Sequence, residues 1–149
     1  MTTPLRAGDR LPPLRLSPIS RATLALYAGA SGDHHPAHID TDAARAAGHD
    51  DVFVHGMLNM AYLGRLLTGL VPQGRIRSYG VRFTAITPVH AEPTCTATVT
   101  GVEGGAARLD LAVTLADGTV TLRGTAVIDV ETDPETDPET DLEEGTWTG

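Results

Sequence analysis

One stretch of fifteen residues constrains the fold more than any other part of the chain. From Gly56 to about Leu70 the residues are apolar nearly all round a helix, with Gly64 and Gly69 as positions of close approach. This pattern is typical of a helix buried in the centre of a domain. Four strand-like runs follow it, over residues 76–86, 94–102, 108–115 and 120–130. A long apolar helix followed by four strands predicts an α+β fold, with a curved antiparallel sheet wrapped around the helix.

Helix and turn signals organise the rest of the chain. Ser17-Pro18 predicts the start of a helix that reaches about Ala30, because Ser is a good N-cap and Pro fits the first helical position. A short helix over residues 42–47 can be ended by Gly48 in a left-handed conformation. Residues 31–50 are therefore expected to be an excursion from the core. Gly-Gly and Asp-Gly pairs between the later strand runs predict an antiparallel meander.

The charge of the chain is concentrated at its C-terminal end. The formal net charge is −8, and residues 131–149 hold eight acidic side chains in a repeating four-residue unit, without Lys or Arg. The remaining residues balance eleven acids with eleven arginines, so the basic stripe of a nucleic-acid-binding protein is missing. We expect one folded domain over residues 1–130 and a disordered acidic tail over residues 131–149.

Targeting and cysteine signals are sparse. The sequence has no run of eighteen apolar residues and no signal-peptide pattern at its start, which favours a soluble, cytoplasmic protein that does not bind membranes. Its single cysteine, Cys95, lies in an alternating strand-like run and cannot form an internal disulfide.

The residues best suited to chemistry lie in the excursion. Asp33 and His38 are five residues apart on a segment interrupted by Gly32 and Pro36, where the backbone can turn both side chains towards one cleft. A carboxylate and an imidazole can divide the proton transfers of a reaction between them. The alternative is an Asx-type turn at Asp33 and a structural His38.

A second candidate feature lies at the start of the apolar helix. The amide of Gly56 is one of the first amides of that helix, which have no intrahelical acceptor and can stabilise a developing oxyanion. Because glycine lacks a side chain, a substrate carbonyl could approach this backbone closely. The alternatives are a glycine that serves helix packing, and a neighbouring His55 that only fixes the start of the helix.

Together these segments resemble a known motif. Residues 27–38, then Ala44, Gly48 and His55-Gly56-Met57, resemble the hydratase motif of MaoC-like dehydratases and R-specific enoyl-CoA hydratases. The resemblance extends through residues 79–89 and is greatest to the single-hotdog, mycobacterial-type 3-hydroxyacyl-thioester dehydratase subunits. It implies a hotdog fold over residues 1–130. It also implies reversible hydration of 2-enoyl thioesters, or dehydration of R-3-hydroxyacyl thioesters, in fatty-acid or polyketide metabolism.

The resemblance also implies roles for individual residues. Asp33 and His38 would be the acid–base pair that holds the catalytic water, and the Gly56 amide would polarise the thioester carbonyl. Substrate contacts or supporting hydrogen bonds are expected from a wider set: Ser31, His35, Ala37, His55, Asn59 and Arg82. This chain departs from the usual motif at two of these positions, since His35 replaces Asn and Ala37 replaces a branched apolar residue. We expect those changes to affect substrate choice and proton affinities more than reaction class.

Several alternatives accompany this interpretation. A metal site built from His34, His35 and His38 is disfavoured, because Pro36 prevents the three from sharing a helical face. No cofactor is expected, since coenzyme A or phosphopantetheine would enter as part of an acyl-CoA or acyl-carrier-protein substrate. Arg75, Arg77 and Arg82 could bind phosphates or be ordinary exposed arginines.

The reaction and the assembly also leave choices open. Other hotdog chemistry on thioesters, such as a thioesterase or isomerase reaction, remains an alternative, as does an auxiliary subunit without catalysis. Because an open sheet leaves its edge strands exposed, we expect a homodimer or a heterodimer with another hotdog chain.

Overall fold

A single antiparallel sheet dominates residues 4–130, the part of the chain that the computed structural model describes. Its strand order is β1-β3-β4-β5-β2. The strands span Leu14–Arg15 (β1), Ile76–Phe83 (β2), Thr94–Glu103 (β3), Ala106–Thr114 (β4) and Val120–Asp129 (β5). The meander of β3, β4 and β5 is confirmed, with Gly104, Gly105 and Gly118 in left-handed turn conformations. The short strand β1 was not predicted.

One face of the sheet packs on the central helix, α3, which spans Gly56–Leu70 as predicted. Alternate residues of β3 to β5 point to this face and are buried with Leu63, Leu66 and Leu67 of the helix. The expectation of burial all round the helix is wrong for the single chain. Met57 is 53% exposed, because the sheet covers only one side of the helix.

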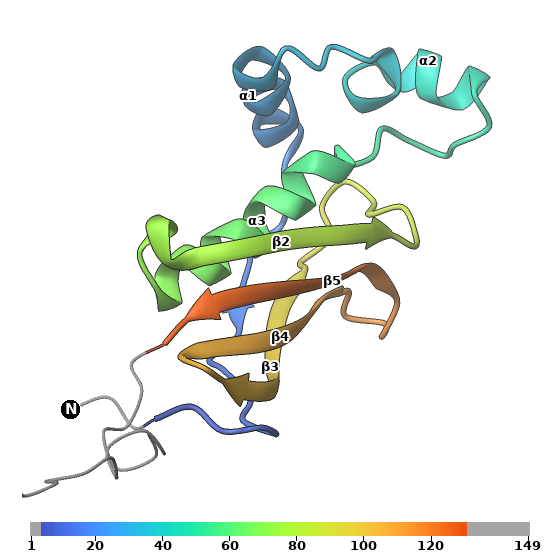
Figure 1. Ribbon diagram of the computed structural model, residues 1–149. Coiled ribbons are helices and arrows are strands. Elements are labelled where there is room, and N and C mark those ends of the chain that lie inside the picture. Colours follow the sequence, from blue (N-terminus) through green and yellow to red (C-terminus); the bar gives the residue numbers. More distant parts are fainter. Residues whose placement is uncertain (1–3, 131–149) are drawn as a thin grey trace, which may run out of the picture.

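The excursion has a small core of its own. It comprises α1 (Arg21–Ser31), a 3-10 turn η1 (Pro36–His38) and α2 (Thr41–Ala46). In Figure 1, α1 and α2 both lie above the start of α3, on the side away from the sheet. Buried residues of the excursion and its flanks pack against Leu58 in the first turns of α3; they are Ile19, Leu24, Ala44, Val52 and Val54. This cluster fixes the excursion over the start of the central helix.

Helix α1 begins later than predicted. Ser20, and not Ser17, is the N-cap, and its side chain accepts a hydrogen bond from the amide of Thr23. The residues before it are extended because they pair with a distant segment: the amide of Ile19 donates to the carbonyl of Ala91 at 3.0 Å. Tertiary pairing therefore overrides the local helix-start signal. Strand β2 likewise ends at Phe83, three residues before the predicted limit.

The sheet wrapped on one helix is the hotdog arrangement, so the predicted α+β fold class is confirmed. A last 3-10 turn, η2 (Gln73–Arg75), joins α3 to β2. Among the described residues, none of the helices has the length and hydropathy needed to cross a bilayer. The predicted acidic tail lies outside the described residues.

Candidate active site

The segment after α1 places Asp33 by local hydrogen bonds. Gly32 ends the helix with φ 76°, the tight left-handed bend that its position predicts. The Ser31 hydroxyl accepts from the amide of Asp33 at 3.2 Å, and Asp33 Oδ1 accepts from the amide of His35 at 3.2 Å. The second contact is the Asx turn that was considered as an alternative. It leaves Asp33 Oδ2 without a hydrogen-bond partner in the described part of the chain.

His38 has one ring nitrogen engaged and one available. Its Nδ1 lies 2.8 Å from the carbonyl oxygen of Phe53, which can only accept, so Nδ1 carries a proton. The ring also meets the Phe53 ring edge-on, with centroids 4.7 Å apart. Nε2 of His38 is therefore free to accept a proton or, once protonated, to give one.

His55 lies against both of these residues. It is completely buried, and its ring stacks on that of His38 with centroids 4.0 Å apart and planes 30° apart. Nε2 of His55 lies 3.1 Å from the backbone carbonyl oxygen of Asp33, so this nitrogen is the donor. Burial is the main reason why the pKa of His55 is lowered, and the adjacent His38 adds to that effect, while the bond to Asp33 opposes it. The geometry and the lowered pKa favour a neutral ring.

The first turn of α3 opens onto an apolar cavity. Gly56 is the first helical residue, so its amide has no intrahelical acceptor. The ring of Phe83 lies over its α-carbon: a Cβ at this position would meet Phe83 Cε1 at 3.0 Å. The cavity has a volume of about 300 Å³. It is lined by Phe53, Val54, Gly56, Asn59, Phe83, Ala85, Ile86, Thr87 and Leu122. An amide donor thus borders a space suited to an apolar chain.

Asn59 is the main polar group in that lining. It is 2% exposed, and its Nδ2 donates to the Thr87 hydroxyl at 2.6 Å. Its Oδ1 is buried and has no hydrogen-bond partner in the described part of the chain. The Asn59–Thr87 pair therefore joins α3 to the segment after β2.

Of the other candidate residues, His35 lies near His38, Ala37 is buried in the same segment, and Arg82 lies away from both. The exposed His35 ring has its centroid 5.8 Å from that of His38 and accepts through Nδ1 from the amide of Ala37. Ala37 is buried at the base of the segment and does not line the cavity. Arg82 is not brought to the cluster. Val81, the residue before it, packs on the core. Because side chains alternate along a strand, the Arg82 side chain projects from the opposite face of the sheet, where Arg123 is its cross-strand neighbour.

The structure assembles a possible metal-ligand set that differs from the one considered from sequence. One ligand-type atom each from Asp33, His38 and His55 lies within 4.8 Å of the others. Both histidines donate one N–H to a carbonyl oxygen, and the two rings are stacked. An ion shared by this set would have to bind the nitrogens that these bonds leave, Nε2 of His38 and Nδ1 of His55.

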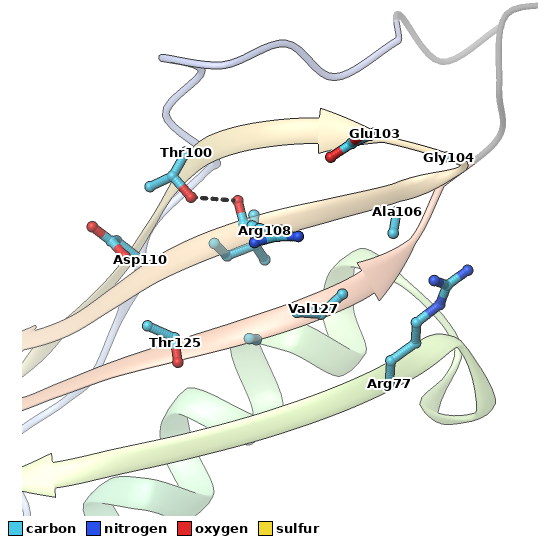
Figure 2. Close-up of a pocket in the computed structure, with 11 residues that line it drawn as sticks. Arg77, Thr100, Glu103, Gly104, Ala106, Arg108, Asp110, Thr125 and Val127 are labelled. Carbon is cyan, nitrogen blue, oxygen red and sulfur yellow. Dashed lines mark hydrogen bonds between the residues drawn. The ribbon is translucent and has the colours of Figure 1, made fainter.

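Two other features of the described chain contribute no chemistry to this cluster. A hollow of about 560 Å³ lies on the sheet face opposite α3, and Figure 2 shows that Arg77, Thr100, Glu103 and Arg108 are among its lining residues. Its lining includes no histidine or cysteine, and Arg77 is paired with Asp129. Cys95 is fully buried, and burial raises the pKa of its thiol to about 12, so it is a poor nucleophile.

Three contributors to the cluster were not predicted from sequence. They are the Phe53 carbonyl, the Phe83 ring and the Thr87 hydroxyl. The first is a backbone atom, for which side-chain identity gives no signal. Phe83 and Thr87 lie in the segment that extended the resemblance, yet their contacts depend on how β2 crosses α3.

Comparisons with known proteins place the chain in a family. The family model described as "MaoC like domain" matches residues 7–120. A 3-hydroxyacyl-thioester dehydratase Z of Mycobacterium tuberculosis is 28% identical over 131 residues, which cover 84% of this chain and 80% of the relative.

Solved structures share the fold. The (R)-hydratase from A. caviae involved in PHA biosynthesis superposes with a TM-score of 0.77 at 25% identity, covering 85% of this chain and 98% of that one. A chain of the ChsH1-ChsH2 complex from Mycobacterium tuberculosis has a TM-score of 0.75 at 24% identity, covering 88% of this chain and 100% of that one. Because the family model spans well over half of the sequence, the chain belongs to the MaoC-like dehydratase family.

Proposed function

We propose that the protein catalyses reversible addition of water to 2-enoyl thioesters, or the reverse dehydration of R-3-hydroxyacyl thioesters. One observation carries the proposal: a carboxylate oxygen of Asp33 and a ring nitrogen of His38 lie within 4.8 Å of each other, and His38 stacks on His55, the residue before the Gly56 amide at the start of α3. The cavity bordered by that amide can take an apolar acyl chain. The dehydratase and (R)-hydratase named among its relatives support the same reaction class.

The proposed chemistry needs two proton transfers and one hydrogen-bond donor. The oxygen of water forms a bond to C3 while one of Asp33 and His38 removes a proton from that water. The π electrons move towards the thioester carbonyl, whose developing negative charge accepts a hydrogen bond from the Gly56 amide. The other member of the pair delivers a proton to C2. Dehydration runs through the same steps in reverse.

The substrate is proposed to be an acyl-CoA or acyl-carrier-protein thioester of fatty-acid or polyketide metabolism in the cytoplasm. Coenzyme A or phosphopantetheine would enter as part of the substrate, and no separate cofactor is proposed. This proposal follows from the mechanism, in which side chains and one backbone amide perform every step. Activity that persists after EDTA treatment would support it, and loss that zinc restores would contradict it.

We propose that the working form is a dimer with a second hotdog chain, identical or different. Strand β2 is an edge of the sheet, with pairing groups free on one side. Phe83 at the end of β2, Ile86 after it and Met57 at the start of α3 are each about half exposed, a larger apolar exposure than an isolated surface residue gives. Size-exclusion chromatography with light scattering tests this: a dimeric mass supports a homodimer, and a monomer requires a different partner chain.

The experiment for the reaction is direct. Purified protein is mixed with crotonyl-CoA, and the loss of the conjugated enoyl absorbance is followed while free thiol is measured in parallel. Loss of absorbance without thiol release, and an R-3-hydroxy product, support hydration. Thiol release would indicate a thioesterase, and a product that keeps its double bond would indicate an isomerase. An enoyl thioester left unchanged, with 3-hydroxybutyryl-CoA equally stable, would reject the proposal.

A further inference from the structure

The buried imidazole of His55 has no part in the proposed proton transfers, yet it contacts both residues that do. Its ring covers one face of the His38 ring at 4.0 Å between centroids. Its Nε2 donates to the carbonyl oxygen of Asp33 at 3.1 Å. The next residue along the chain is Gly56, whose amide is the proposed oxyanion donor. His55 therefore contacts both proton-transfer residues and directly precedes the proposed oxyanion donor.

The tautomer of His55 follows from its surroundings. The carbonyl of Asp33 can only accept, so the ring proton lies on Nε2. Nδ1 is buried and has no hydrogen-bond partner in the described part of the chain. Protonating Nδ1 would create a buried N–H without an acceptor and a charge without solvent, which is costly.

The groups that face His55 leave its neutral form favoured. Tyr27 of α1 meets the His55 ring edge-on, with centroids 4.9 Å apart, and His38 stacks on it from η1. Asp33 accepts through its carbonyl, and its carboxylate, which also accepts from the amide of His35, has an oxygen within 4.8 Å of a His55 ring nitrogen. That negative charge raises the pKa of His55, but burial of the ring lowers the pKa more. A cationic His55 would lie 4.0 Å from a ring that must itself become cationic during turnover.

We propose that His55 is a positioning residue, held as the neutral Nε2–H tautomer, which fixes the Asp33 segment and supports the His38 ring so that the exchangeable proton stays on His38. This inference rests on the proposed function for its kinetic consequence and revises the expectation that His55 binds substrate. His55 contributes alignment, and the binding of the acyl chain falls to the cavity lining.

Two variants test separately the hydrogen bond of His55 to Asp33 and its stacking on His38. His55→Phe keeps an aromatic face for His38 but loses the donor to Asp33, and His55→Gln keeps a donor but loses the aromatic face. Each is expected to lower kcat by about 10- to 100-fold with KM changed less than about threefold, because misalignment acts on the reaction step. The matched control is His90→Asn, an exposed histidine whose left-handed backbone Asn tolerates. A KM raised with kcat unchanged in both variants would overturn the proposal, because that pattern identifies a substrate-binding residue.

A measurement on the wild-type protein removes any dependence on how the variants fold. Nitrogen-15 NMR of the histidine side chains reports the tautomer and charge of each ring. The expected result for His55 is a neutral ring with its proton on Nε2 from pH 8 to pH 6. A cationic ring at pH 7, or a proton on Nδ1, would overturn the proposal. The NMR result needs no substrate, so an inactive wild type counts against the proposed function, and a wrong tautomer counts against the role of His55.

Discussion

The two halves of the candidate site are built in opposite ways. The loop half, residues 31–38, is mostly exposed and is held by hydrogen bonds of 3.2–3.3 Å between residues two positions apart. The helix half, residues 55–59, contains His55 and Asn59, which are 0% and 2% exposed. Each of these two has a buried polar atom with no partner in the described chain. The polar groups of the loop half are exposed to solvent for the most part, whereas the helix half carries a desolvation cost that the surrounding core must offset.

This difference separates chemistry from support. Side chains of the loop half can exchange protons with water because they reach solvent. His55 and Asn59 of the helix half are fixed in a dry environment, where a hydrogen-bond donor is electrostatically stronger than in water. Changes in the loop half should therefore reduce activity and leave stability intact, and changes in the helix half should affect stability as well.

The largest expected effect is the loss of activity in Asp33→Asn. The amide oxygen of Asn can still accept from the amide of His35, so the Asx turn is kept and the free energy of unfolding should change by less than about 0.5 kcal/mol. Hydration of crotonyl-CoA should fall by about 10²- to 10⁴-fold, the usual contribution of an acid–base group. Initial rates and urea unfolding check the two parts. Asp110→Asn, on the exposed face of β4, is the matched control and should change neither.

A smaller loss is expected from a methyl group at the start of α3. In Gly56→Ala the new Cβ meets the Phe83 ring at about 3.0 Å, and this half-exposed ring can shift to accept it. The methyl group then borders the position of the thioester carbonyl, and activity should fall by about 10-fold or more. Gly69→Ala lies in the same helix with nothing within 4 Å of its Cβ. This variant should keep full activity, and its free energy of unfolding, measured in urea, should rise by roughly 0.5–1 kcal/mol. Equal activities of the two variants would show that Gly56 serves helix packing alone.

A double-mutant cycle on Asn59 and Thr87 should measure the desolvation cost in the helix half. Thr87→Val removes the partner of Asn59 Nδ2 and should lower the free energy of unfolding by about 1–3 kcal/mol, because a buried donor loses its acceptor. Adding Asn59→Leu removes the orphaned amide and should recover most of that loss. Chemical unfolding of the single and double variants measures the coupling. A double variant that is less stable than Thr87→Val would show that the amide has other uses in the core.

The smallest expected effect is on the pH dependence of stability. The folded pKa of His55 lies below its unfolded value, so the unfolded chain binds more protons between the two values. The stabilisation is fully present above the unfolded pKa of about 6.5 and is lost as the pH falls towards the folded pKa. Wild-type urea midpoints should therefore drop from pH 7.5 to pH 5.5, and His55→Gln should drop less. Asp51, whose pKa is lowered mainly by its hydrogen bond from Arg21, should act in the same direction only below about pH 4. If the urea midpoints of the wild type and His55→Gln dropped equally, a group other than His55 would be responsible for the pH dependence.

The sequence predicted the architecture well because its strongest signals were local. The bounds of α3 follow from its apolar run, and the hairpins of the meander follow from their glycine turns. The start of α1 could not be predicted in the same way. Ser17-Pro18 is a sound local signal, but pairing of residues 16–19 with residues 90–93 keeps that segment extended.

The site was predictable in its loop half and less so in its helix half. Asp33 and His38 were identified because Gly32 and Pro36 mark an irregular segment in the sequence. The stack of His38 on His55 brings together residues 17 positions apart, and no local pattern encodes it. The Asn59–Thr87 bond depends in the same way on how the segment after β2 crosses α3.

The central claim is that Asp33 and His38 act as one acid–base unit. Its most direct test is to measure kcat/KM for crotonyl-CoA hydration in the wild type, Asp33→Asn, His38→Gln and the double variant. Members of one catalytic unit are strongly non-additive, so each single variant should lose at least about 100-fold and the double variant little more. Single variants that keep the wild-type rate, or losses that multiply in the double variant, would contradict the claim.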